Sequence, residues 1–250
     1  IMEQAQAAAR LSHSSIITIY KVAEFGDLLY MVMEYIPGPS LASYLTQFAA
    51  RNQLIALNQI MAVITQTADA LAAAHEAGVL HRDVRPQNIL LKQLDRAERP
   101  GDPPIRAIVT DFGLAQPIAA GTDRPAPALA GMLPYLSPEQ CLAKSPDGRS
   151  DLYSLGMVFY QMVTGWLPFE VPSAAEATRK HLQEGLPAAR AVRAGLPEAV
   201  ETIINTATAR RPAERYQAAK QMSDALRQAS NALSTAELQR FAPNGTAASL

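Results

Sequence analysis

Three polar residues in the middle of the sequence carry oxygen atoms that could bind a cation or a hydroxyl group. They are Asp83, Asn88 and, beyond a pair of short apolar runs, Asp111. Carboxylate and amide oxygens are ligands that suit Mg²⁺, and a carboxylate can also orient a hydroxyl group and accept its proton. Each of these residues taken singly is more often a turn former or a solvated loop residue. Their combined spacing favours a shared site.

The elements around these residues follow from the pattern of apolar positions. Apolar residues at three- and four-residue spacing predict a helix over 54–77, and a more apolar helix is expected from about 151 to 164. The short apolar runs 88–91 and 105–109 predict two strands joined by a polar loop. Asp83 is therefore expected on the loop between the first helix and the first of these strands.

Regular structure is also expected toward both ends of the chain. Residues 2–11 lack Gly and Pro and predict a helix, while the runs 16–22 and 28–35 predict a β-hairpin. Residues 115–129 are rich in Pro and Ala, which indicates an extended surface loop. Helical spacing returns over 198–229.

The order of the polar residues resembles the signature of the eukaryotic-like protein kinases. The triplet 81–83 with Asn88 is similar to the catalytic loop, the triplet 111–113 to the magnesium loop, and the triplet 137–139 to the end of the activation segment. The resemblance extends to the bacterial Hanks-type serine/threonine kinases. It implies an α+β, protein-kinase-like fold with a complete, mainly α-helical C-lobe, a hinge, and a partial N-lobe of one helix and two strands. The implied parts are a partial N-lobe over 1–33, a hinge over 34–36, a C-lobe over 37–229, and a tail or linker over 230–250.

The resemblance implies transfer of the γ-phosphoryl group of ATP to hydroxyl groups of protein substrates, with Mg²⁺ as the metal. Asp83 would lie against the substrate hydroxyl and accept its proton, while Asn88 and Asp111 would bind Mg²⁺. Arg85 would act at the catalytic position where the family carries a lysine. Arginine keeps the positive charge there but changes its shape and reach.

The resemblance also implies an adenine site around the hinge. Met33 would be the gatekeeper residue, and the backbones of Glu34 and Ile36 would bind the edge of the adenine ring. Leu90 would lie under the ring. These four residues, together with Asp111, form the predicted ATP site.

Five further residues are assigned supporting roles by the same resemblance. His81 and Phe112 would pack beneath the site, and Asp151 would brace the backbone of the catalytic loop. Glu139 would form an ion pair with Arg215.

A regulatory contact is also expected. Thr122 is the only hydroxyl-bearing residue between Gly113 and Tyr135. If Thr122 is phosphorylated, its charge would pair with Arg82 and order the loop.

The sequence departs from the family pattern at four places, of which Arg85 is one. Gly26 is the first glycine and Lys21 the first lysine, so the family's glycine-rich loop and strand lysine do not occur in this chain. Gln4 stands where the family carries a glutamate, and Met132 where it carries a threonine. We therefore expect an N-terminally truncated kinase that binds ATP weakly by itself and is inactive alone. The alternative is a catalytically impaired pseudokinase that acts as a scaffold or regulatory binding module.

The composition excludes several other classes of protein. Apolar residues make up 48% of the chain and charged residues 18%, with 22 basic against 23 acidic side chains. A disordered chain and a strongly basic nucleic-acid binder are thereby excluded. The kinase resemblance implies ATP and protein substrates as the partners. The single cysteine, Cys141, excludes an internal disulfide and a multi-cysteine zinc site. A cytoplasmic location is expected, and a membrane anchor in a full-length parent stays open, although no apolar stretch here approaches the roughly 20 residues of a spanning helix.

Overall fold

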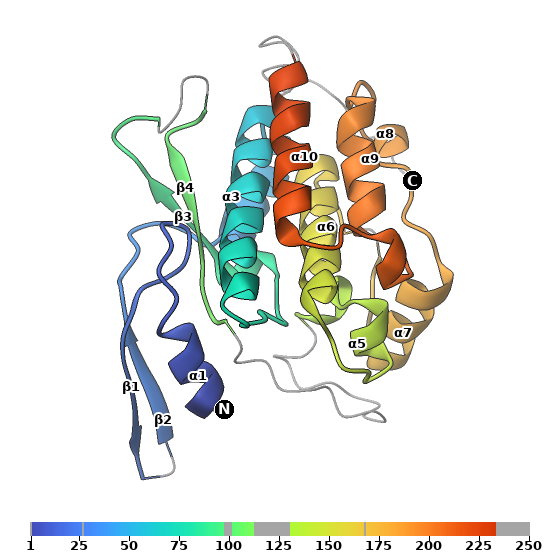
Figure 1. Cartoon of the computed structure of the whole chain (residues 1–250). Coiled ribbons are helices and arrows are strands. Elements are labelled where there is room, and N and C mark those ends of the chain that lie inside the picture. Colours follow the sequence, from blue (N-terminus) through green and yellow to red (C-terminus); the bar gives the residue numbers. More distant parts are fainter. Residues whose placement is uncertain (1, 27, 98–101, 113–130, 168, 234–250) are drawn as a thin grey trace.

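The computed structural model of the chain describes residues 2–26, 28–97, 102–112, 131–167 and 169–233. Two small antiparallel sheets lie along one side of a body of helices (Figure 1). In chain order the elements are α1 (Met2–Ala8), β1 (Ile19–Phe25), β2 (Leu28–Met33), α2 (Leu41–Ala50), α3 (Leu57–Glu76), the 3₁₀ helix η1 (Pro86–Asn88), β3 (Ile89–Gln93), β4 (Ile105–Val109), the 3₁₀ helix η2 (Leu133–Tyr135), α5 (Pro138–Cys141), α6 (Gly148–Thr164), α7 (Ala174–Gln183), α8 (Ala189–Val192), α9 (Glu198–Ala207), the 3₁₀ helix η3 (Pro212–Glu214) and α10 (Ala219–Ala232).

The helices α3 and α6 form the centre of the helical body. α6 is buried on nearly every side, and its buried residues include four polar ones, Ser150, Asp151, Ser154 and Thr164. It begins after Asp147, whose side chain accepts a hydrogen bond from Arg149 N, and it ends at Gly165, which has a left-handed φ of 82°. α10 packs against α3, and α9 packs against α6. Both predicted central helices are therefore confirmed, with α6 starting at Gly148.

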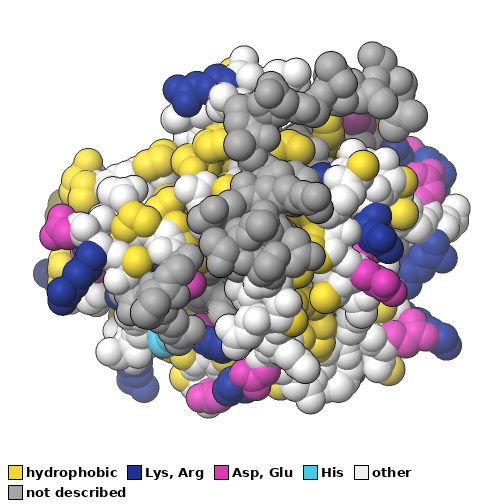
Figure 2. Space-filling view, turned by 90° about the horizontal axis from the view of Figure 1, so that it is seen from above, with side chains coloured by type: hydrophobic (Ala, Val, Ile, Leu, Met, Phe, Trp, Pro, Cys, Tyr) yellow, Lys and Arg dark blue, Asp and Glu magenta, His cyan; other side chains and the backbone are white. Residues whose placement is uncertain are grey.

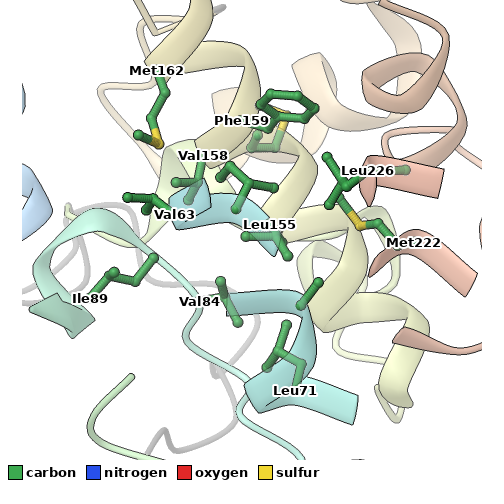
Figure 3. Close-up of a cluster of buried hydrophobic side chains, with 14 of the residues drawn as sticks. Val63, Leu71, Val84, Ile89, Leu155, Val158, Phe159, Met162, Met222 and Leu226 are labelled. Atoms are coloured by element: carbon green, nitrogen blue, oxygen red, sulfur yellow. The ribbon is translucent and has the colours of Figure 1, made fainter. Parts of the chain in front are cut away.

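Val84, in the loop after α3, and Ile89, the first residue of β3, anchor this loop in the core. Val84 and Ile89 are buried in the same apolar cluster as Leu71 of α3 and Leu155 of α6, and Figure 3 shows all four in this cluster. Because protein cores are closely packed, these two side chains fix the path of the loop that carries Asp83.

Each sheet consists of two antiparallel strands. In the first sheet, β1 pairs with β2, with Phe25 opposite Leu28 at the turn, so the predicted hairpin is confirmed. In the second, β3 pairs with β4, with Ile89 opposite Val109. A backbone hydrogen bond joins the segment before β1 to the second sheet, because Ile17 N donates to Val109 O, at the end of β4, at 2.9 Å.

The helical stretch predicted over 198–229 is wrong in one respect, because it is divided into α9 and α10. Pro212 lies between the two helices and begins the 3₁₀ helix η3. Proline lacks a backbone N–H and disfavours helical geometry in the preceding residue, and Arg211 is indeed extended, with φ −84° and ψ 124°. At its far end α10 continues to Ala232.

The surface carries charges of both signs close together. In Figure 2, basic and acidic side chains lie beside one another around the rim of the molecule, in keeping with the net charge of −1. Within the described residues, no helix is both long and apolar enough to cross a membrane. The surface loop expected over 115–129 lies outside the described residues.

Candidate active site

The carboxylate of Asp83 is held by two neighbours in the loop 81–88. Asn88 Nδ2 donates hydrogen bonds to both Asp83 O and Asp83 Oδ2, each at 2.9 Å. Arg85 Nε lies 3.1 Å from the same carboxylate oxygen. The orientation of the carboxylate is thereby set by contacts to Oδ2, and its side chain remains 14% exposed.

The electrostatic surroundings of Asp83 favour a stronger base. Burial raises the pKa of Asp83 above its ordinary value, whereas Arg85 and the hydrogen bond from Asn88 act in the opposite direction. The charge of Asp111 adds to the rise in the Asp83 pKa, so the two carboxylates are close enough to interact. A higher pKa makes a carboxylate a better proton acceptor.

His81 connects the loop to the end of β4. Its Nδ1 accepts a hydrogen bond from Asp83 N at 3.2 Å, so the ring proton is on Nε2, which donates to Thr110 O at 3.0 Å. Burial lowers the pKa of His81 even though nearby carboxylates such as Asp151 oppose this shift. The ring lies against Phe112, with 4.6 Å between the ring centroids. A neutral His81 therefore packs beneath Asp83 and bonds to the strand end.

Asp151, in the first turn of α6, binds the loop backbone. One carboxylate oxygen accepts from Arg82 N at 2.7 Å, and the other accepts from His81 N at 2.9 Å. His75 Nε2 lies 2.8 Å from that second oxygen. Sequence reasoning assigned no site role to His75, because its partner lies on another helix, 76 residues further along the chain.

Asn88 and Asp111 lie at neighbouring ends of the second sheet. Thr110 N donates to Asn88 O at 3.0 Å, which places Asp111 one residue beyond this pair. Asp111 has a φ of 65°, a conformation uncommon outside glycine that often marks functional positions. The amide nitrogen of Asn88 faces Asp83, which leaves the amide oxygen as its ligand atom. One amide and one carboxylate oxygen suit Mg²⁺, which is usually bound by few protein ligands together with water and phosphate.

The residues expected around the adenine ring form one apolar cluster. Met33, Ile36 and Leu90 pack together with Ile17 and Ile108. The side chains thus come from the segment before β1, from β2 and the segment after it, and from β3 and β4.

Glu34, between Met33 and Ile36, is held at both its backbone and its side chain. Its N–H donates to Thr18 O at 2.8 Å, and its carboxylate lies 3.8 Å from Lys92 Nζ. Within the described residues, no group bonds to the carbonyl of Glu34 or to the N–H of Ile36.

Arg215 and Glu139 form a bidentate ion pair, with nitrogen–oxygen distances of 2.7 and 2.9 Å. The Arg215 side chain is fully buried and also donates to Ala209 O at 2.7 Å. Burial alone would raise the pKa of Glu139, but the hydrogen bonds from Arg215 and from Ser150 outweigh it and hold that pKa below its ordinary value. The guanidinium group also lies over the Tyr153 ring, 4.8 Å from its centroid.

Two residues that differ from the family pattern, Met132 and Gln4, lie in different parts of the structure. Met132 packs against Leu133 and its apolar neighbours. On α1, Glu3 is exposed while Gln4 is half-buried, which agrees with the helical face expected for Gln4. Thr122, the expected partner of Arg82, lies outside the described residues.

Gln140 contacts the loop but was not identified from the sequence. Its Nε2 donates to Arg82 O at 2.9 Å, and its Oε1 accepts from Ser137 N at 3.0 Å. The Ser–x–x–Gln spacing could have predicted the second contact, which belongs to the capping box at the start of α5. No local signal could have predicted the first contact, which spans 58 residues.

The chain is also similar in sequence to known proteins. Residues 1–228 match the family described as the protein kinase domain. The chain is 36% identical over 219 residues to the serine/threonine-protein kinase PrkC of Bacillus subtilis, which covers 88% of this chain and 32% of PrkC. It is 34% identical over 244 residues to the serine/threonine-protein kinase PknL of Mycobacterium tuberculosis, covering 98% of this chain and 58% of PknL. The chain therefore spans about a third of the length of PrkC and somewhat over half of the length of PknL.

A solved structure shows the same fold. The crystal structure of the Mycobacterium tuberculosis PknI kinase domain matches with a TM-score of 0.67 at 25% sequence identity. The match covers 89% of this chain and 74% of that structure. The two small sheets and the helical body thus have the arrangement of a protein kinase domain.

Proposed function

Because the chain belongs to the protein kinase domain family, we propose that it is part of an ATP-dependent enzyme that phosphorylates serine or threonine hydroxyl groups of proteins. The observation that most supports this proposal is the contact of Asn88 with Asp83 beside the end of β4, where Asp111 lies. Two carboxylates and an amide in this arrangement suit both proton transfer and binding of Mg²⁺–ATP.

In the proposed reaction, Asp83 orients the substrate hydroxyl group and accepts its proton. Asn88 and Arg85 contact Oδ2, so Oδ1 is the atom that can face the hydroxyl group. The raised pKa of Asp83, caused by burial, strengthens it as a base. Arg85 would also face the transferred phosphoryl group as a positive charge.

Asn88 and Asp111 would hold Mg²⁺ through the amide oxygen and the carboxylate. When bound, Mg²⁺ neutralises the phosphate charge that develops during transfer. The strained backbone of Asp111 and the hydrogen bonds of Asn88 would keep both ligands in place.

The adenine ring would lie at the apolar cluster of Met33, Ile36 and Leu90. The carbonyl of Glu34 and the N–H of Ile36 would bind its edge. The same proposal assigns His81, Phe112 and Asp151 to support of the loop, and the ion pair of Glu139 with Arg215 to support of the helical body. Three contacts support these assignments: His81 with Thr110, Asp151 with Arg82, and Arg215 with Glu139.

Regulation by phosphorylation of Thr122 is a further part of the proposal. The phosphate would pair with Arg82, whose backbone is already fixed by Asp151. Mass spectrometry after incubation with an active partner kinase should detect phosphate on Thr122. Phosphate found only at other residues would contradict this assignment.

Transfer of labelled phosphate tests the proposed activity. The product of the complete reading frame that encodes this chain should label protein substrates from radiolabelled ATP. Asp83→Asn should reduce labelling by roughly 100- to 10,000-fold, because general-base catalysis contributes that much. Gln87→Ala is the matched control, since Gln87 lies in the same loop with its side chain exposed.

The same assay judges the second candidate function. A non-catalytic scaffold is suggested by Gln4, Arg85 and Met132, each of which replaces a residue of the family's active site. If labelling is absent, or is the same in the Asp83→Asn variant, the scaffold replaces the enzyme as the function of this chain.

A further inference from the structure

Arg82, directly before Asp83, is held at both of its peptide groups by side chains from other elements. Its N–H donates to Asp151 Oδ1 at 2.7 Å, and its carbonyl accepts from Gln140 Nε2 at 2.9 Å. Its φ is 67°, a left-handed conformation that a long side chain rarely adopts. A residue stays in such a conformation only where its surroundings hold it there.

The amide group of Gln140 has an orientation that its partners determine. Its oxygen accepts from Ser137 N, and its nitrogen donates to the carbonyl of Arg82. The opposite orientation would place donor against donor and acceptor against acceptor. The capping box of α5 therefore aims one N–H of Gln140 at the catalytic loop.

We propose that Gln140 is a positioning residue that couples the start of α5 to the conformation of the loop at Asp83. α5 directly follows η2, so it comes soon after residues 113–130 in the chain. A displacement of α5 would move the amide of Gln140 and release the carbonyl of Arg82. Asp151 holds the other side of Arg82 from α6, so the loop keeps its active geometry only while both elements are in place. The catalytic meaning of this coupling rests on the proposed function, whereas the coupling itself does not.

Gln140→Glu separates the two contacts of this side chain. At neutral pH the new carboxylate can still accept from Ser137 N, but it has no proton to donate to Arg82 O. Hydrogen–deuterium exchange measured by mass spectrometry should show roughly 3- to 10-fold faster exchange of the amides of residues 81–83, as expected for loss of one hydrogen bond. The amides of α5 and the melting temperature should stay as in the wild type.

Ser137→Ala is the matched control. It removes the cap hydroxyl, which bonds to Gln140 N and Gln140 Oε1, but keeps the hydrogen bond from Ser137 N to Gln140 Oε1 and the contact of Gln140 with Arg82. It should speed exchange in α5 and leave residues 81–83 unchanged. If Gln140→Glu does not fold, Gln140→Met replaces it. Methionine removes both the N–H donor and the acceptor oxygen, so exchange at residues 81–83 in this variant is compared with that in Ser137→Ala, which keeps the donor. Wild-type exchange at residues 81–83 in the folded variant overturns the proposal, as does equal loss of protection in the loop and in α5 of Gln140→Glu.

A kinetic readout separates positioning from a merely structural role. In the product of the complete reading frame, Gln140→Glu should lower kcat about 10-fold or more while the KM for ATP stays unchanged, because Asp83 is misplaced but the nucleotide site is intact. If Gln140→Glu speeds exchange in the loop but leaves kcat unchanged, the coupling exists but does not position Asp83 for catalysis. If the wild type shows no kinase activity, the exchange experiment still decides whether the coupling exists.

Discussion

His181 on α7 is buried between two hydrogen-bonding partners. Its Nε2 lies 2.9 Å from Leu133 O, so this nitrogen carries the proton, and its Nδ1 accepts from Tyr153 OH at 2.9 Å. Burial lowers the pKa of His181 to about 4, although the Leu133 carbonyl opposes the shift. Protonation would both charge a buried ring and abolish the acceptor that Tyr153 uses.

His181 should make the stability of the protein depend on pH. Its pKa is lower in the folded than in the unfolded state, so between pH 6.5 and about 4 the unfolded chain binds more protons and the free energy of unfolding falls with the pH. At a pH below both pKa values, this difference in pKa lowers the free energy of unfolding by about 3 kcal/mol. Urea titrations from above pH 7 down to pH 4.5 should show a shallower decline in the free energy of unfolding for His181→Gln than for the wild type, with parallel behaviour above pH 7. Identical slopes would contradict the assignment.

The segment 34–40, between β2 and α2, packs closely against strand β3. Leu91 N donates to Pro39 O at 2.9 Å, and a Cβ atom added to Gly38 would lie 1.9 Å from Leu91 O. Only glycine fits there without movement of the backbone.

Gly38→Ala should therefore lower the free energy of unfolding by about 1–3 kcal/mol, as overpacking does in well-packed cores. Gly185→Ala is the matched control, because the nearest atom to an added Cβ there is Arg210 Nη2 at 3.8 Å, an ordinary contact. Denaturant unfolding of both variants measures the difference. Equal stability of the two variants would show that the contact between this segment and β3 is not rigid.

The ion pair between α5 and the segment after η3 joins distant parts of the helical body. Arg215→Ala should lower the free energy of unfolding by about 3–5 kcal/mol, because it leaves the Glu139 carboxylate largely buried without its partner. Arg211→Ala is the control, since Arg211 is 81% exposed in its pair with Glu214 and exposed pairs contribute about 0–1 kcal/mol. Thermal unfolding followed by circular dichroism compares them. An unchanged melting curve for Arg215→Ala would remove the structural role of this pair.

Across the whole molecule, stability should differ between the helical body and the β1–β2 hairpin. α3 and α6 are buried on most sides, whereas Phe25 and Tyr20 of β1 are 79% and 67% exposed. A two-stranded hairpin is marginally stable by itself, so it should open locally without global unfolding. Native-state hydrogen exchange should be more than about 100-fold faster in the hairpin than in α6. Equal protection would show instead that the hairpin unfolds together with the core.

Much of the molecule could be predicted because its signals are local. The periodic apolar faces of α3 and α6 appear in consecutive residues, as does the alternation of strand-forming runs in the hairpin. The loop residues Asp83 and Asn88 are only five positions apart in the chain, so a contact between them could be expected from their spacing, although the buried Val84 and Ile89 fix the path of the loop. The break between α9 and α10 was missed because the helical spacing on its two sides outweighed the single Pro212.

Contacts between distant residues depended on how the helices pack. His75 reaches Asp151 because α3 ends beside the first turn of α6, and Gln140 reaches Arg82 because α5 lies against the loop. Such pairs leave no pattern in the chain, since a glutamine or histidine on a helix has many partners available to it. The packing of the core decides which partner is bound. A polar group that is buried without a hydrogen bond destabilises the folded state, so each buried side chain must pair with a group that the packing brings within reach.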